Sequence, residues 1–535
     1  MKKLLLIILL AGFLRFYGLG DVPVGFHIDE ASLGYNGYSM LKTGRDEHGN
    51  KFPLYIDMFG DNRPSGYHYL TIFPIAIFGL NEFATRLPGA FFGTISVLSF
   101  FILVMAITRD KKVALMSSLL LAISPWHIVS SRASAESIVA LFFILTGFAY
   151  ILRSLSGQNI RSLVFGFILL ALSFQFYHTP RVFVPLIIIC IAAMVVKNHV
   201  RFSRRFKIAG MLCCFALTFI SLLLVFGISG GTGRFSQVSI FGFPQTRLVM
   251  EEQFREDGIM GTPLVAVRIF HNKITNYFLT FVSNYTDYFS GKFLFIEGGK
   301  PPWYKIPDMG LIYLAELPFI IIGFAYLLTQ KRFMLKFPLV WLALAPVVAS
   351  ITTDDIPNIQ RSMVMFPMLE LIAVFGIVKS RRYVGMLFIV FIFVCNVAYF
   401  FHQYVVHGSS HQTLYRFNGF KEMVLEVKQK HDVVDRIVMT KTGGGIYPHV
   451  LFFTQYDPST YQKEGSPKDP DFAGFGKFIF SPQFCPSTES SDNVIKTGRA
   501  LFVDSGTCEI SPLAKTQKIF REDGSTAFVI VYPNE

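Results

Sequence analysis

Two short polar segments follow the first apolar run of this chain, and both carry residues suited to acid–base chemistry. The first is His27-Ile28-Asp29-Glu30 and the second is Asp61-Asn62-Arg63-Pro64. Acids are costly to desolvate at a bilayer boundary, so a cluster of them there usually marks a working site. A carboxylate can accept a proton from a hydroxyl or hold a cation, while an arginine can bind a phosphate.

Each acid in these segments has a candidate role. Asp29 is the candidate base. Glu30 follows it directly, so in any regular structure the two side chains diverge; Glu30 is a further catalytic candidate, or it holds the loop or a metal. Asp61 could converge with Asp29 to ligate a divalent cation (Mg, Mn or Zn) or to orient an acceptor, with His68 as another metal ligand. The alternative for each acid alone is a solvated loop carboxylate.

The elements that must position these residues belong to a membrane protein. The 535 residues are 52% hydrophobic and include 58 Phe, and the mean hydropathy is +0.47. We expect an α-helical polytopic protein with about 11 transmembrane helices. The apolar runs lie at 4–20, 87–108, 113–130, 137–152, 162–177, 182–196, 208–228, 309–328, 337–351, 363–378 and 383–401. The shorter run Tyr67 to Phe78 is expected to lie along the interface or to re-enter from it.

The net charge of +13 indicates orientation rather than nucleic-acid binding, because the basic residues form short clusters between apolar runs. Six clusters fall on one side under strict alternation of the spans: Lys2-Lys3, 109–112, 153–161, 197–207, 331–336 and 379–382. The positive-inside rule places that side in the cytoplasm. The long loops 21–86 and 229–307 and the C-terminal tail are then extracytoplasmic.

Arginines on the outer side are the second group of candidates. The planar guanidinium fork suits phosphate oxygens, so a phosphate at the membrane surface would account for arginines that run against the charge bias. The alternative is contact with lipid head groups. The donor phosphate-binding candidates are Arg63, Arg132, His178, Arg181 and Arg361.

Beyond about residue 402 the chain reads as a small α/β domain, giving a division into 1–401 and 402–535. Residues 419–430 are expected to form an amphipathic helix. Strands are expected at 437–440, 477–481, 500–504 and 527–531. Cys485 and Cys508 could pair if this domain is extracytoplasmic.

An enzyme that works outside the cytoplasm lacks nucleotide sugars and ATP, so its donor must arrive already activated through the bilayer. A polyprenyl-phosphate sugar meets that need. Transfer to an acceptor hydroxyl or amine then requires a base near the acceptor and cations near the departing phosphate.

The chain resembles the polyprenyl-phosphate-dependent membrane glycosyltransferases with the GT-C fold, which include the protein O-mannosyltransferases and the lipid A aminoarabinose transferase. The resemblance covers about residues 1–400 in architecture and the first 190 or so in motifs. It rests on segments 27–30, Arg63-Pro64-Ser65-Gly66-Tyr67-His68-Tyr69, Gly79-Leu80-Asn81-Glu82-Phe83-Ala84-Thr85-Arg86-Leu87-Pro88 and 131–136. It implies Asp29 as the acidic site residue, with Asp61 to Arg63 supplying a second acid and a cation for the donor phosphate. The sequence Asp61-Asn62-Arg63-Pro64 departs from the commoner Lys-Pro-Pro or Glu-Lys-Pro form.

The expected function is therefore that of an inverting glycosyltransferase in the plasma (inner) membrane, moving a single sugar from a polyprenyl-phosphate donor to a lipid, glycan or protein acceptor. The alternative is a transporter or flippase for a lipid-linked glycan. A transporter would need charged residues inside several helices, whereas the apolar runs here are mostly uninterrupted.

Overall fold

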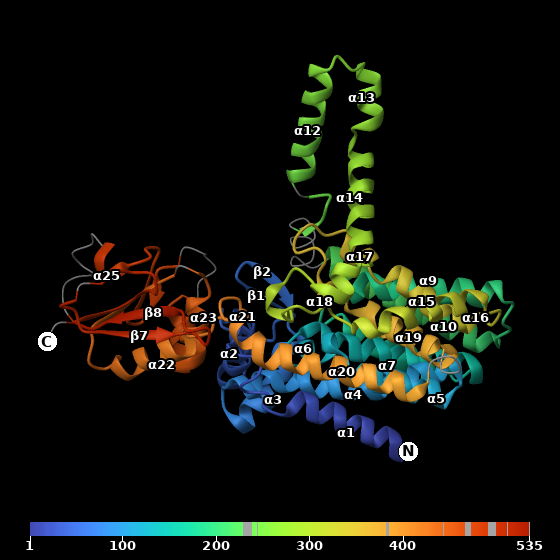
Figure 1. The fold of residues 1–535 in the computed structure, drawn as a ribbon, viewed down its shortest axis with the longest axis horizontal. Helices are drawn as coiled ribbons and strands as arrows, with labels where there is room; N and C mark the ends of the chain where they lie inside the picture. Colours follow the sequence, from blue (N-terminus) through green and yellow to red (C-terminus); the bar gives the residue numbers. More distant parts are fainter. Residues whose placement is uncertain are drawn as a thin grey trace. The chain divides into compact units, whose positions relative to one another are not determined.

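A computed structural model describes residues 1–227, 238–242, 244–380, 385–441, 443–465, 472–489, 499–510 and 512–533 (Figure 1). The chain divides into two compact units. The first comprises Met1–Arg15, Phe91–Ser131 and Ala135–Phe400, and the second comprises Phe16–Ala90, Arg132–Ser134 and Phe401–Glu535. The second unit joins the polar loop after the first helix to the C-terminal region. The expected division into 1–401 and 402–535 stays a prediction.

The first unit is built from apolar helices. Within the described residues, seven helices are long and apolar enough to cross a membrane, and the pair 111–123 and 125–132, bent by 54°, would make an eighth. The seven are Glu82–Thr108, Glu136–Gly157, Pro180–Lys197, Arg204–Phe226, Phe333–Ser350, Ile359–Ser380 and Met386–His411. Three other expected spans coincide with shorter helices: α1 (Lys2–Phe16), α8 (Ile160–Ser173) and the 314–329 segment. The fold class expected from the sequence, a helical multi-pass membrane protein, is confirmed.

The labels used for the helices of this unit have the following bounds. They are α4 (Glu82–Thr108), α5 (Lys111–Ile123), α6 (Pro125–Arg132), α7 (Glu136–Gly157), α9 (Pro180–Lys197), α10 (Arg204–Leu222), α12 (Pro244–Ile259), α13 (Leu264–Phe270), α14 (Lys273–Asp287), α15 (Leu317–Thr329), α16 (Phe333–Leu344), α17 (Val347–Ser350), α18 (Ile359–Ser362), α19 (Phe366–Ser380) and α20 (Met386–Phe401). Position 228 of the run 208–228, the segment 229–237 of the second large loop, the start of the run 383–401 and the basic residues Arg381 and Arg382 lie outside the described residues.

Close helix packing in this unit depends on glycine. A Cβ on Gly323 of α15 would overlap the carbonyl oxygen of Ile372 in α19, and a Cβ on Gly376 of α19 would overlap that of Phe319 in α15. Small residues let helix backbones approach in a membrane, where van der Waals packing replaces the hydrophobic drive. The α15–α19 pair is therefore fixed by reciprocal glycines.

The second unit combines a loop subdomain with a six-stranded sheet. The loop subdomain contains α2 (Ile28–Thr43), the hairpin β1 (Tyr55–Met58) and β2 (Asp61–Pro64), and α3 (Gly66–Phe78). The sheet has the order β4-β5-β3-β6-β8-β7, with β3 parallel to β5 and β6 and the outer pairs antiparallel. Its elements are α22 (Phe420–Lys430), β3 (Arg436–Thr440), α23 (Ile446–Thr454), α24 (Pro458–Lys463), β4 (Gly474–Phe475), β5 (Phe478–Ser481), α25 (Pro486–Glu489), β6 (Ala500–Ser505), β7 (Thr516–Phe520) and β8 (Thr526–Val531). The expected helix and four strands are confirmed.

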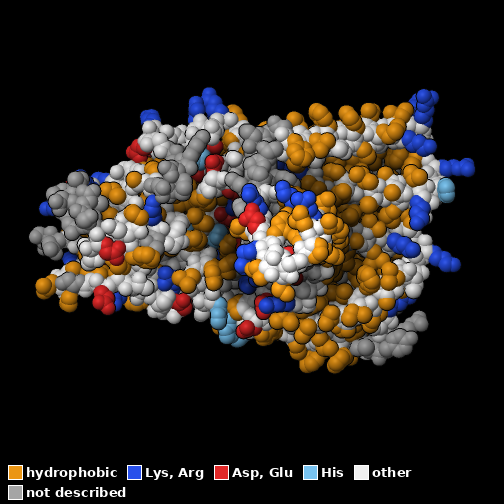
Figure 2. All heavy atoms as spheres, turned by 90° about the horizontal axis from the view of Figure 1, so that it is seen from above, with side chains coloured by type: hydrophobic (Ala, Val, Ile, Leu, Met, Phe, Trp, Pro, Cys, Tyr) orange, Lys and Arg blue, Asp and Glu red, His pale blue; other side chains and the backbone are white. Residues whose placement is uncertain are grey.

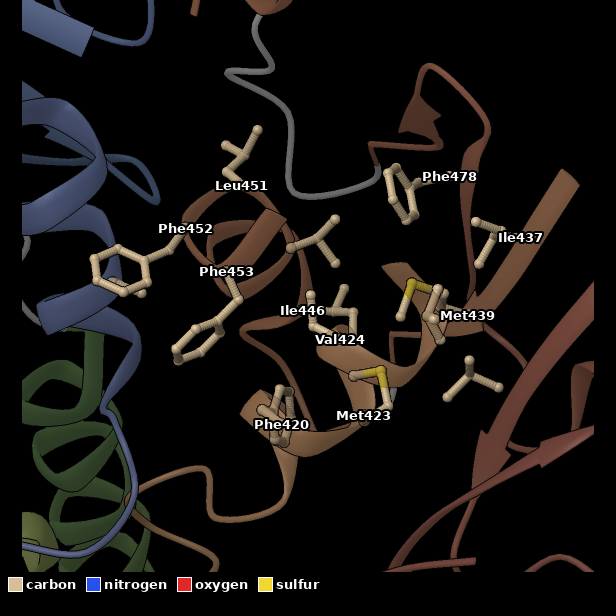
Figure 3. Close-up of a cluster of buried hydrophobic side chains, with 14 of the residues drawn as sticks. Phe420, Met423, Val424, Ile437, Met439, Ile446, Leu451, Phe452, Phe453 and Phe478 are labelled. Atoms are coloured by element: carbon tan, nitrogen blue, oxygen red, sulfur yellow. The ribbon is translucent and has the colours of Figure 1, made fainter. Parts of the chain in front are cut away.

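One apolar cluster joins the loop subdomain to the six-stranded sheet (Figure 3), and Met40, Ile56 and Met58 form a separate small cluster. On the sheet side the larger cluster includes Met423 and Val424 of α22, and on the loop side Tyr35 of α2. Helix α2 lies against α23 so closely that a Cβ on Gly34 would meet the ring of Phe452 at 2.5 Å. The helix that carries Asp29 in its first turn is thus packed onto the C-terminal domain.

Candidate active site

The start of α2 determines where Asp29 points. His27 is the N-cap: its Nδ1 accepts a hydrogen bond from the backbone N–H of Asp29 at 3.2 Å. Glu30 completes a capping box by accepting from the backbone N–H of His27 at 3.1 Å. These side chains satisfy backbone donors that a helix start leaves open. Asp29 lies in the first turn of this helix, between the two residues of the capping box.

The β1–β2 hairpin brings the second polar segment to the same place. Phe59 and Gly60 both have positive φ, as a tight two-residue hairpin turn requires. Asp61 and Arg63 lie two residues apart on β2, so their side chains share one face of the strand. That face turns Arg63 toward Asp29.

Arg63 lies between the two aspartates. Its Nη1 is 2.9 Å from Asp29 Oδ2, and its Nε donates to Asp61 Oδ2 at 3.0 Å. The three side chains are each only about a fifth exposed, at 21% for Asp29, 22% for Arg63 and 23% for Asp61. We call Asp29, Arg63 and Asp61 the loop cluster. The structure thus brings Asp61 and Arg63 together beside Asp29, and their functional roles stay predictions.

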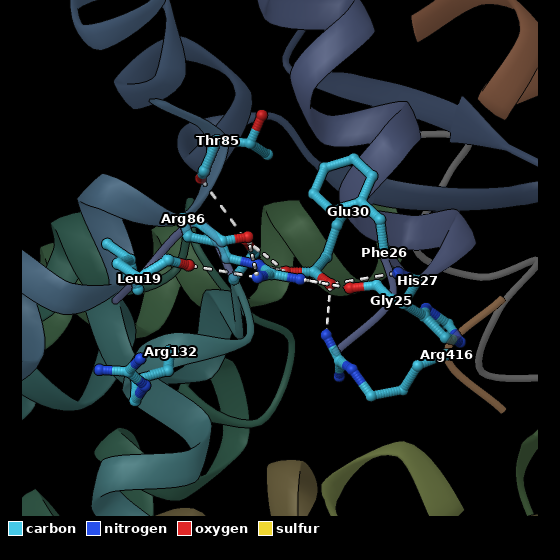
Figure 4. A network of polar contacts seen from close by, with 12 residues as sticks. Leu19, Gly25, Phe26, His27, Glu30, Thr85, Arg86, Arg132 and Arg416 are labelled. Carbon is cyan, nitrogen blue, oxygen red and sulfur yellow. Dashed lines mark hydrogen bonds and ion pairs between the residues drawn. The ribbon is translucent and has the colours of Figure 1, made fainter. Parts of the chain in front are cut away.

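Glu30 lies in a different environment from Asp29 (Figure 4). Its side chain is 2% exposed and accepts from Arg86 Nε at 2.8 Å and from Arg416 Nη2 at 2.6 Å. Ser134 Oγ donates to it as well, at 3.2 Å. Burial alone would raise the pKa of Glu30, but the two arginines outweigh it and lower that pKa to about 2. Of the roles considered for Glu30, these contacts favour the one in which it holds the loop.

Two other predicted site residues also make contacts in this unit. Arg132 Nη2 donates to the backbone carbonyls of Gly18 at 3.0 Å and Val22 at 2.9 Å, so the guanidinium braces the turn before α2. His68 on α3 is fully buried, and within the described part of the chain its ring nitrogens make no hydrogen bond. The phosphate-binding role of Arg132 and the ligand role of His68 stay predictions.

The loop cluster does not fit a bound metal ion in this arrangement. Arg63 occupies the space between the two carboxylates, where a divalent cation would bridge them. Across the described ranges, no three His, Cys, Asp or Glu side chains gather closely enough to hold an ion. The divalent cation therefore stays a prediction.

The remaining predicted residues, His178, Arg181 and Arg361, line one cavity in the first unit. Its volume is about 330 Å³, and its other lining residues are largely aliphatic, among them Val182, Val225, Val348 and Ile351. Arg361 forms a bidentate pair with Asp354, at 2.9 Å from Nη1 and 2.7 Å from Nη2. Arg181 Nη1 donates to His178 Nδ1 at 3.1 Å.

Two arginines were missed as partners of the site. The sequence-based candidates include Arg86 only as part of the segment 79–88, and they do not include Arg416. Both are fully buried, and Arg86 also donates to the carbonyls of Leu19, Gly20 and Gly25. Arg86 directly precedes the apolar run 87–108, where a charged residue needs a partner, and this is its one signal in the sequence. Arg416 lies in none of the apolar runs and offers no such signal.

Comparison with known proteins gives two matches to parts of this chain. The model of the family "Dolichyl-phosphate-mannose-protein mannosyltransferase" matches residues 7–229. A curated protein of Aquifex aeolicus, described as uncharacterized, is 30% identical over 149 residues, which cover 27% of this chain and 28% of that protein. The enzyme class of the family, glycosyltransferase, agrees with the prediction from sequence.

The solved structures identify the fold. ArnT from Cupriavidus metallidurans bound to undecaprenyl phosphate is 12% identical, with a TM-score of 0.53 over 98% of this chain and 97% of that chain; its apo state gives 13% and 0.52 with the same coverage. The oligosaccharyltransferase AglB of Archaeoglobus fulgidus, in complex with an inhibitory peptide and a dolichol-phosphate, is 12% identical with a TM-score of 0.49; this chain spans 63% of its length. The chain therefore has the fold of the GT-C glycosyltransferases, as its motifs predicted, and its residues 7–229 match the dolichyl-phosphate-mannose-protein mannosyltransferase family.

Proposed function

We propose that this protein transfers a single sugar from a polyprenyl-phosphate donor to an acceptor hydroxyl or amine outside the cytoplasm, with inversion at the anomeric carbon. The observation that carries the proposal is the loop cluster. It presents a partly exposed carboxylate, Asp29, that pairs with Arg63, whereas the next residue, Glu30, is buried and paired with two arginines.

Asp29 acts as the base in this proposal. The acceptor O–H or N–H donates to the Asp29 carboxylate, which takes the proton as the acceptor atom bonds to the anomeric carbon. The bond from that carbon to the phosphate oxygen breaks on the opposite face, and polyprenyl phosphate leaves with the electron pair. Arg63 and Asp61 hold the Asp29 carboxylate in one orientation, which lowers the entropic cost of reaching the reactive geometry.

The cavity in the first unit suits the donor. Its aliphatic lining matches a prenyl chain, and Arg181 and Arg361 offer the charge that the phosphate requires. Arg361 already binds a carboxylate in the two-point geometry that a phosphate also adopts. We propose that the phosphate takes the place of Asp354 on Arg361 when the donor binds.

We propose that the protein lies in the plasma (inner) membrane, with the loop cluster and the C-terminal domain extracytoplasmic. The basic clusters between spans support this orientation. The Cys485–Cys508 disulfide, with 5.8 Å between the Cα atoms, supports it independently, because disulfides persist in oxidising compartments.

The test is transfer from a synthetic polyprenyl-phosphate sugar by the full chain in nanodiscs. Asp29→Asn is expected to lower kcat by about 100-fold or more, the usual contribution of a general base, with donor KM nearly unchanged. Asp21→Asn is the matched control, because Asp21 is an exposed acid of the same loop. Full activity of Asp29→Asn would remove the proposed base, and donor movement across liposomes without transfer would favour the flippase.

A further inference from the structure

Helices α12, α13 and α14 form a long hairpin that projects from the first unit (Figure 1). The arms α12 and α14 pack side by side, and Asn276 Nδ2 donates to Gln253 Oε1 at 3.2 Å between them. An ion pair of 3.2 Å between His271 and Asp257 ties the arms together near the tip. We call residues 244–287 the interfacial hairpin. The established fold and the proposed reaction give it no role.

Helix α14 exposes a strongly apolar face. Its polar Asn276 is 7% exposed, whereas Ile274 is 81% exposed and Phe278 is 63% exposed. The exposed apolar residues of this helix, Ile274, Phe278, Leu279 and Val282, follow a helical spacing and form one stripe. A helix that buries amides and presents Ile and Phe outward is arranged for an apolar surrounding.

The exposed apolar surface continues around the tip. Large side chains there stand mostly clear of other residues: Ile259 is 70% exposed, Met260 82%, Leu264 63%, Val265 71% and Phe270 66%. A contiguous exposed patch of this kind marks an interaction surface or a membrane contact. In Figure 2, which looks down on the tip, hydrophobic side chains gather on one side of the hairpin and charged ones on the other.

The base of the hairpin lies at the end of a membrane span. Asn284 Nδ2 donates to the carbonyls of Ser350 and Thr352, both at 3.0 Å. Ser350 is the last residue of the apolar helix 333–350, which is long enough to cross a bilayer. In Figure 1 the hairpin runs across the direction of spanning helices such as α7 and α19. The C-terminal end of α14 therefore packs on the end of a span, and the axis of α14 crosses the axes of the spanning helices. A helix in this position lies in the plane of the bilayer surface.

We propose that the interfacial hairpin lies in the head-group region of the outer leaflet, with the stripe of α14 and the tip inserted among the acyl chains. Four basic and five acidic residues make it nearly neutral, so apolar burial rather than attraction to anionic lipid drives the insertion. The hairpin anchors the rim of the first unit at the level where a lipid-linked substrate presents its head group.

The test places a fluorophore at single cysteines in the full chain, reconstituted in phosphatidylcholine nanodiscs. The four free cysteines, Cys190, Cys213, Cys214 and Cys395, are first replaced by Ala, and the disulfide is kept. Phe270→Cys and Phe278→Cys report on the apolar side. Glu252→Cys reports on the charged arm, and Leu212→Cys on a span, since Leu212 of α10 is 64% exposed.

Labels at 270 and 278 are expected to be quenched by lipid-attached nitroxide as strongly as the label at 212, and severalfold more than the label at 252. The label at 252 is expected to be quenched by aqueous iodide instead. Replacing half of the phosphatidylcholine by an anionic lipid is expected to leave the pattern unchanged. Iodide quenching at 270 and 278 would overturn the proposal. Shielding of both sites from both quenchers would also overturn it, because a protein partner or a second copy would then cover the patch.

Discussion

Asp29 and Glu30 are chemically similar neighbours with different surroundings. The carboxylate of Glu30 accepts hydrogen bonds from two buried arginines, a serine and a backbone N–H, so its lone pairs are committed. Asp29 shares Arg63 with Asp61 and stays about a fifth exposed. A general base needs an oxygen that an acceptor can reach, which is why we propose Asp29 as the base and Glu30 as a residue that holds the loop.

We expect Arg63 to orient Asp29 through the planar geometry of its guanidinium group rather than through its charge alone. Arg63→Lys keeps the charge, but one ammonium cannot match the planar geometry that serves both carboxylates, so kcat should fall about 10-fold. Arg63→Gln should lower kcat by about 100-fold, because Asp29 then loses its orienting partner. Lys51→Gln, which removes an exposed cation of the same loop, should leave kcat unchanged. Single-turnover transfer measures the step, and wild-type kcat in Arg63→Lys would contradict the fork.

The buried cap of α2 predicts how stability depends on pH. Burial is the main cause that lowers the pKa of His27 to about 4, so the folded state keeps the ring neutral where the unfolded chain takes up a proton. Stability is therefore expected to fall as the pH drops from about 6.5 to 4, by at most about 3 kcal/mol for this group. The depressed pKa of Glu30 adds a loss between about pH 4.5 and 2 as its carboxylate is protonated.

His27→Asn separates these two contributions, since asparagine is a good N-cap that does not titrate. The variant should show a flatter decline of Tm between pH 6.5 and 4 than the wild type. His431→Asn, at a half-exposed site in the C-terminal domain, should keep the wild-type slope. Thermal unfolding in detergent followed by circular dichroism gives the slopes, and equal slopes for His27→Asn and wild type would refute the role of the cap.

At the scale of elements, the sequence predicted what local patterns encode. The strands found from sequence have buried faces, such as β3, whose residues 437–440 are all buried. The missed strand β7 has largely exposed side chains and lies at the sheet edge, so no alternation marks it, and β4 has only two residues. Asp61 and Arg63 were singled out because they lie in the same loop as Asp29, whereas the hairpin that places them on one face of β2 was not predicted. Arg416 was missed because it reaches Glu30 across 386 positions, which no local pattern can signal.

The close approach of α2 to α23 makes Gly34 a sensitive position. Gly34→Ala puts a methyl at 2.5 Å from both the Phe452 ring and Thr85 Oγ1. Overpacking of this kind should cost about 1–3 kcal/mol and lower Tm. Gly210→Ala is the matched control, because that helical glycine meets only Leu163, at 3.9 Å, and alanine favours the helix. A Tm for Gly34→Ala equal to that of Gly210→Ala would show that the two elements do not pack as described.

At the scale of the whole molecule, the C-terminal region and the first polar loop share one core and one buried charge network. Besides the Arg416–Glu30 pair, His449 Nε2 lies 2.7 Å from the carbonyl oxygen of Phe26. Deletion at about residue 402 would expose this core and remove one partner of Glu30. Such a deletion therefore tests loop positioning together with the predicted role of the tail in binding or orienting the acceptor.

Arg416→Gln separates these two roles of the C-terminal region. Breaking a buried pair by removing one partner costs about 3–5 kcal/mol, so Tm and kcat should fall while acceptor KM stays near the wild-type value. The double variant with Glu30→Gln should lose less stability than the sum of the single variants. Arg499→Gln, at an exposed site of the same domain, should behave as wild type. A rise in acceptor KM with unchanged kcat would instead assign Arg416 to acceptor binding.

The orientation of the whole chain decides whether the proposed chemistry is possible, because an active site outside the cytoplasm must take its donor from the lipid. In cells expressing the variant without free cysteines, Asp432→Cys should react with a membrane-impermeant maleimide added outside, since Asp432 is 99% exposed in the C-terminal domain. Lys111→Cys, at the first residue of α5 in the basic cluster 109–112, should react only after permeabilisation. The reverse pattern would place Asp29 with the cytoplasmic nucleotide sugars, and a lipid-borne donor would then no longer be required.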